Sequence, residues 1–142
     1  MKNLILRIDI LLIFSGFIFL AIFFILFIIQ YFYISKNLKG LCEIIFNDSK
    51  AYKVPLEPFD FYFLSCLPLV FWRETLSIKK GIIFSKLYGK EYYFKIEKNQ
   101  LIQLLEKYPR FFQIQYLIFI FIFFAFIFMF VGVFLNKFFF VY

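Results

Sequence analysis

Residues 10–29 read ILLIFSGFIFLAIFFILFII, and residues 116–135 read YLIFIFIFFAFIFMFVGVFL. Neither stretch contains a charged side chain, and Ser15 is the only polar side chain in the first. At a rise of about 1.5 Å per residue, 20 residues form a helix about 30 Å long, which matches the hydrocarbon core of a bilayer. Lipid offers unpaired backbone groups no hydrogen-bond partner, so both stretches should be helical although Phe and Ile are mediocre helix formers in water. The two stretches therefore predict two transmembrane helices.

The composition of the whole chain supports this interpretation. Of the 142 residues, 64% are hydrophobic and 18% are charged, whereas about a quarter are charged in ordinary soluble domains. A soluble chain of this size cannot bury so much apolar surface, and the same apolar fraction argues against disorder. Lys2 and Arg7 resemble the start of a signal peptide, but residues 30–33 (QYFY) lack the small residues of a cleavage site. We interpret the first stretch as an uncleaved anchor.

These observations predict an all-α fold: a two-span transmembrane helical hairpin with a mostly helical, membrane-associated connecting segment. Tyr31 and Tyr33 mark one membrane interface, as does Tyr116 on the second span. The expected segments are a short extracytoplasmic N-terminus at 1–9, a first transmembrane helix at 10–34, a cytoplasmic connecting region at 35–111, a second transmembrane helix at 112–136 and an extracytoplasmic C-terminus at 137–142.

The basic residues predict the orientation. Eight Lys and Arg residues of the connecting region lie close to a span, against three near the chain ends, which favours a cytoplasmic connecting region with both termini outside. The net charge of +7 is then a topology signal together with attraction to anionic lipid headgroups. The residues expected to contact headgroups are Lys36, Lys39, Lys79, Lys80, Lys107 and Arg110. No soluble module for nucleic-acid binding is indicated.

The connecting region contains one unusual segment. The first helix should continue past the membrane, because Leu38, Leu41 and Ile45 have helical spacing, and should stop near Asn47. A loop should follow at 47–58. Residues 59–72 are strongly aromatic but too short to span. This segment is expected to lie at the headgroup boundary or to bind a partner. The candidate interface residues are Phe59, Phe61, Phe63, Phe71 and Trp72.

The rest of the region leads into the second span. Residues 73–89 fit a basic amphipathic helix, although the stretch 76–96 also has the features of a β-hairpin. Residues 97–111 predict an amphipathic helix with Asn99 as its N-cap. Pro109 should kink this helix where it enters the second span.

Small residues predict how the two spans pack. Helices in lipid approach most closely at such residues. Ala125 and Gly132 share one face of the second helix, and in an antiparallel hairpin they reach depths similar to those of Ala21 and Gly16, respectively. These four residues are the candidate packing positions.

The residues needed for chemistry are missing. Neither uncharged stretch contains the ionisable groups that transporters need, and the glycines do not have the spacing of a phosphate-binding loop. With two Cys and no His, a metal site or a disulfide scaffold is not expected. We therefore expect no enzyme, no cofactor, no metal and no small-molecule substrate.

One segment resembles a known family. Tyr93, Ile102, Glu106, Arg110 and Phe112, which lead into the second span, resemble the cytoplasmic helix and span junction of universal stress protein B. This chain is longer, and its Pro109 interrupts a helix that is continuous in the family. The resemblance implies a bacterial inner-membrane protein with one span at each end and a link to stress physiology, without catalytic residues.

Three functional hypotheses follow. The first is a small membrane protein that acts as a regulator or scaffold through protein–protein or protein–lipid contacts, with a membrane-protein partner or a second copy of itself. The second is an accessory subunit of a large membrane complex. The abundance of Phe, Ile, Lys and Tyr suits the AT-rich codons of a mitochondrial genome, so the mitochondrial inner membrane is the alternative location. The third is an immunity protein against a membrane-active toxin.

Overall fold

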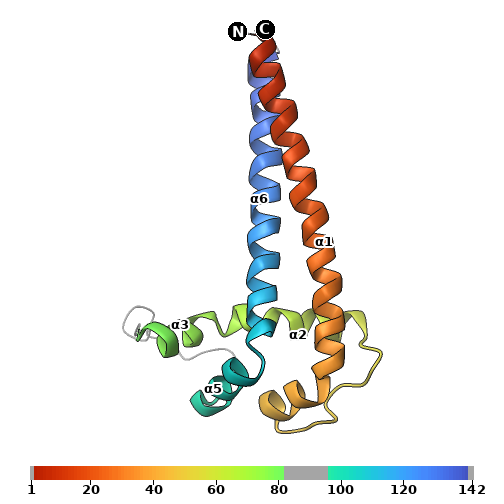
Figure 1. Cartoon of the computed structure of the whole chain (residues 1–142), viewed down its shortest axis with the longest axis vertical. Helices are drawn as coiled ribbons and strands as arrows, with labels where there is room; N and C mark the ends of the chain where they lie inside the picture. Colours follow the sequence, from red (N-terminus) through yellow and green to blue (C-terminus); the bar gives the residue numbers. More distant parts are fainter. Residues whose placement is uncertain (1, 82–95, 141–142) are drawn as a thin grey trace. The chain divides into compact units, whose positions relative to one another are not determined.

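The computed structural model describes residues 2–81 and 96–140, with side chains from 8–81 and 96–138. Within these residues the chain forms five α-helices and no strand (Figure 1). They are α1 (Lys2–Phe46), α2 (Pro58–Val70), α3 (Trp72–Lys80), α5 (Lys98–Lys107) and α6 (Pro109–Phe140). The predicted all-α fold is confirmed: α1 and α6 are long and apolar enough to cross a membrane, and shorter helices join them.

The chain divides into two compact units. The hairpin unit comprises Met1–Ile28 and Leu117–Tyr142, and the second unit comprises Ile29–Tyr116. In the hairpin unit, α1 and α6 lie side by side and antiparallel (Figure 1). Asn136 contacts Asp9 near one end, whereas farther along, the ring of Phe19 stacks on that of Phe128 with centroids 5.3 Å apart.

Close contacts in the hairpin unit occur at glycine. A Cβ atom added at Gly16 would collide with Met129 and lie 3.2 Å from the carbonyl oxygen of Ala125. A Cβ atom at Gly132 would lie 2.7 Å from Cγ1 of Ile13. Because neither glycine has a side chain, Met129 can pack against Gly16 and Ile13 can pack against Gly132.

The four candidate packing residues thus have different environments. Gly16, Gly132 and Ala125 lie at the contact between the helices, whereas Ala21 is exposed. Five residues of an α-helix turn through about 140° beyond one full turn, so Ala21 points away from the face that carries Gly16. Gly16 therefore faces Ala125 and Met129, and Gly132 faces Ile13, so the packing partners differ from Gly16 with Gly132 and Ala21 with Ala125.

A polar pair near the chain ends was missed by the sequence analysis, which assigned Asp9 to the short N-terminal segment. Asp9 lies within α1 and has no exposed surface. The side-chain nitrogen of Asn136 donates a hydrogen bond of 2.8 Å to Oδ2 of Asp9, and the backbone N–H of Ile10 donates one of 2.8 Å to Oδ1. A buried carboxylate is costly unless it is hydrogen-bonded, so this pair stabilises the antiparallel arrangement.

The second unit is built around a core of Leu, Ile and Phe side chains. The end of α1, α2, α5 and the start of α6 all contribute to it. Burying one such side chain contributes about 1.5–3 kcal/mol relative to leaving it exposed. The core includes Ile34, Leu38, Leu41, Leu64, Leu67, Phe71, Leu101, Leu104, Phe111 and Phe112.

Amide side chains connect the helices of this unit. Within the second unit, Nε2 of Gln30 donates to Oε1 of Gln115 at 3.0 Å, and both side chains are buried. Nε2 of Gln100 donates to the carbonyl oxygen of Ile44 at 2.9 Å, which ties α5 to the last turns of α1. Buried amides are stable only when they are paired, so these bonds restrict how the helices can slide.

The helix ends agree with some predictions and correct others. The first helix stops at Phe46, as expected, and Asn47 follows with a left-handed φ of 55°, which Asn tolerates better than most residues. The N-cap of α5 is Glu97, not Asn99, because Oε1 of Gln100 accepts the backbone N–H of Glu97 at 3.0 Å.

The expected kink at Pro109 is instead a break. α5 ends at Lys107, Tyr108 has φ −128° and ψ 53°, and Pro109 begins α6. Proline is favoured at the first position of a helix, where no N–H is needed. The alternative of helix or hairpin at 76–96 is decided only as far as Lys80, which is helical, because 82–95 lie outside the described residues.

Gly132→Leu is expected to separate the two long helices. The added side chain would meet Ile13 and the Asp9 carbonyl, and overpacking of this kind costs about 1–3 kcal/mol. The measurement is disulfide cross-linking between Phe19→Cys and Phe128→Cys in a chain whose own two cysteines are replaced by Ser. Cross-linking should fall for Gly132→Leu and stay unchanged for the exposed control Ala21→Leu; equal cross-linking in both variants would contradict the packing.

Candidate functional site

The predicted aromatic interface is divided between core and surface. Phe61 and Phe71 are buried in the second unit. Phe59, Phe63 and Trp72 keep 87%, 44% and 49% of their surface exposed. The division follows helix periodicity, since residues three or four apart lie on one face and intermediate residues on another. A partner could reach only the second group.

The exposed residues of α2 form a continuous stripe, which we call the α2 outer face. Its large apolar members are Phe59, Tyr62, Phe63 and Val70, at spacings of three, one and seven residues, and the exposed Cys66 lies between Phe63 and Val70. The ring of Phe63 also stacks on that of Phe46 at the end of α1, with centroids 6.4 Å apart. Aromatic side chains on a helix surface are typical of membrane interfaces. Exposed apolar patches are typical of sites that contact other proteins.

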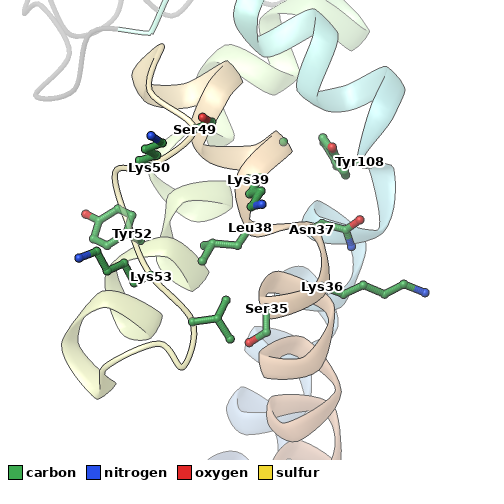
Figure 2. Close-up of a pocket in the computed structure, with 12 residues that line it drawn as sticks. Ser35, Lys36, Asn37, Leu38, Lys39, Ser49, Lys50, Tyr52, Lys53 and Tyr108 are labelled. Carbon is green, nitrogen blue, oxygen red and sulfur yellow. The ribbon is translucent and has the colours of Figure 1, made fainter.

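The second feature is a cavity of about 750 Å³ lined by four lysines, which we call the lysine cavity (Figure 2). Lys36 and Lys39 come from α1, and Lys50 and Lys53 from the loop before α2. Asp48 shapes this loop, because its Oδ1 accepts the backbone N–H of Lys50 at 2.8 Å. The loop thereby returns alongside the turn of α1 that precedes it.

The lining of the cavity carries positive charge. None of its lining residues carries a carboxylate. Figure 2 shows Lys39 between the helix and the loop, while Lys36 and Lys53 extend to opposite sides. All four lysines are exposed, so their long, flexible stems allow the ammonium groups to turn toward a bound anion.

Hydroxyl groups supply neutral donors in the same cavity. Ser35, Ser49 and Tyr52 are among its lining residues, although Oγ of Ser35 itself has no accessible surface. Burial raises the pKa of the Tyr52 phenol, and the nearby Asp60 carboxylate raises it further. Tyr52 therefore stays protonated at neutral pH and can donate a hydrogen bond.

Gly40 and Tyr108 form one wall of the cavity. A Cβ atom at Gly40 would collide with the hydroxyl of Tyr108 and lie 3.0 Å from Cζ. Both residues also line a second cavity of about 400 Å³, with Glu97, Gln100 and Lys107. Only glycine at position 40 allows the Tyr108 ring to approach this turn of α1.

The other predicted headgroup residues lie elsewhere. Lys79 and Lys80 are exposed in the last turn of α3, Lys107 lines the second cavity, and Arg110 is exposed near the start of α6. Lys50 and Lys53 were absent from the predicted set, because a loop has no periodic pattern that shows where it folds. Both are among the eight basic residues close to a span, which indicate the orientation but not a shared cavity.

A metal site would need several of the remaining polar and thiol side chains close together. No three His, Cys, Asp or Glu side chains are grouped there in a way that could hold a metal ion. Cys42 is a buried free thiol and Cys66 an exposed one.

Comparison of the chain with protein families, curated proteins and solved structures finds no match. The candidate site therefore depends on the geometry of this chain alone. It consists of the α2 outer face and the lysine cavity, both within the second unit.

Proposed function

We propose that this chain is a small integral membrane protein that acts through contacts, as a regulator or scaffold, and carries out no catalytic step. In this proposal α1 and α6 hold the chain in the bilayer, and the second unit presents the contact surfaces. The observation that carries it is the exposure of apolar side chains along both long helices, with few residues of either span buried.

The alternative of two core helices in a soluble protein agrees poorly with this exposure. Phe17, Ile25, Phe126 and Phe130 each leave more than half of their surface uncovered. In water, each exposed Å² of apolar surface costs about 25 cal/mol, whereas lipid removes that cost. An exposed apolar helix with its backbone groups paired internally suits hydrocarbon.

For the contacts, the α2 outer face is the strongest candidate. Phe59 is the most exposed of the four residues and lies in the first turn of α2. Interfaces between proteins are enriched in aromatic residues at their centres. We propose a membrane-protein partner at this face.

We further propose a bacterial inner membrane, with the second unit in the cytoplasm and both chain ends outside. The support is the distribution of Lys and Arg, together with the resemblance of 93–112 to universal stress protein B, of which only 96–112 lie within the described residues.

Reporter fusions test this orientation. Alkaline phosphatase, which folds only outside the cytoplasm, should be active when fused after residue 142 and inactive when fused after residue 81. A green fluorescent protein should give the reverse pattern, which controls for expression. Activity of the phosphatase at position 81 would contradict the orientation without affecting the two-span fold.

Site-specific photocross-linking tests the contact surface. A photoreactive amino acid at Phe59 or Val70 should form a protein adduct of defined mass in native membranes, because both positions are exposed on the α2 outer face. The matched control is Glu106, which is exposed on α5. Adducts of equal yield from position 106, or lipid adducts alone at 59 and 70, would remove the proposed protein partner.

A further inference from the structure

We propose that the lysine cavity binds a phosphate group, carried by the headgroup of an anionic glycerophospholipid. This inference rests on the proposed membrane location and adds a ligand class to it. The expected general attraction of basic residues to headgroups needs no cavity, whereas here four lysines, two hydroxyl donors and a glycine-dependent wall form one site.

The charge of the site selects an anion. Four lysines and no carboxylate line the cavity, so its lining favours an anion over a cation. Lysine binds as a point charge and does not need the planar, two-pronged geometry that arginine requires. Such a set suits a tetrahedral phosphate, which offers negative oxygens in several directions.

The neutral groups favour the same ligand. Ser49 and Tyr52 also line the cavity, and their hydroxyls are neutral hydrogen-bond donors. Phosphate oxygens accept hydrogen bonds from hydroxyls as well as from ammonium groups.

The size of the cavity leaves room for more than a bare anion. Its volume of about 750 Å³ lies within the range of small-molecule sites, roughly 300–1,000 Å³. Leu38 and Val54 add apolar atoms to a lining that is otherwise rich in lysines and hydroxyls. A phosphate joined to a glycerol backbone with acyl chains has both an anionic group and apolar atoms.

Position along α1 favours a lipid over a soluble phosphate. Lys36 and Lys39 follow within two turns of the predicted span 10–34, on the same uninterrupted helix. Five residues of helix advance about 7.5 Å, and the headgroup layer extends roughly 5–8 Å beyond the hydrocarbon core on each side. The lysines therefore lie at the depth where lipid phosphates are found.

The test uses the full-length chain in a mild neutral detergent, with native mass spectrometry to count bound molecules. Short-chain phosphatidylglycerol, short-chain phosphatidylcholine and inorganic pyrophosphate are added in separate titrations. The cavity variant is Lys39→Gln with Lys53→Gln, which removes one charge from each wall. The matched control is Lys98→Gln with Lys137→Gln, which removes the same charge from exposed positions on α5 and α6.

Phosphatidylglycerol should bind the unchanged chain and the control with similar affinity, and the cavity variant about tenfold or more weakly. Helix content by circular dichroism should be equal in all three chains. If both variants bind phosphatidylglycerol equally more weakly, the lysines act only through general electrostatic attraction and the cavity proposal is wrong. If neither variant binds more weakly, the proposal is also overturned. Tighter binding of phosphatidylcholine than of phosphatidylglycerol would contradict the charge argument.

The remaining outcomes distinguish a lipid phosphate from a soluble phosphate, and the proposed phosphate site from the proposed protein partner. Saturable binding of pyrophosphate that depends on Lys39 and Lys53, without competition from phosphatidylglycerol, would overturn the lipid as the source. If the unchanged chain shows no preference for phosphatidylglycerol but still forms protein cross-links from position 59, the proposed phosphate site is refuted and the protein partner is not. The opposite result, selective lipid binding without those cross-links, would refute the protein partner and leave the cavity supported.

Discussion

Water solvates apolar side chains poorly, and α1 and α6 expose them along most of their length. In hydrocarbon the same surfaces carry no penalty, and the helical backbone satisfies its own hydrogen-bonding groups. The antiparallel contact then depends on close approach, which Gly16 and Gly132 permit, and on the Asp9–Asn136 pair, whose hydrogen bond offsets the cost of burying a carboxylate. The two long helices are therefore better suited to lipid than to water.

The second unit has a different chemistry, because it must pack a core in the presence of water or headgroups. Its helices therefore have two faces: Leu and Phe side chains, including Phe61 of α2, point inward, while lysines and the α2 outer face remain exposed. Exposed aromatics and lysines side by side are the combination expected of a surface that contacts both lipid and protein. The proposed regulator or scaffold role follows from these contacts and requires no reacting group.

Local pattern was enough to predict much of this fold. Uncharged stretches identified both long helices, and the spacing of Leu38, Leu41 and Ile45 identified the continuation of α1 to Phe46. Long-range contacts were not accessible in the same way. Burial of Phe61 and Phe71 depends on which face of α2 meets the core, and the lysine cavity depends on a loop that folds back on α1. The break at Tyr108 depends on proline starting a helix instead of bending one.

The central claim is that two helices of this chain cross a bilayer as a hairpin. Spin labels placed singly at exposed positions of residues 10–29 and 117–135, in lipid vesicles, measure depth by their relative contact with oxygen and with a water-soluble nickel complex. Oxygen contact should be highest near Ala21 and Ala125 and decline toward both ends of each stretch. Strong nickel contact throughout either stretch would contradict it.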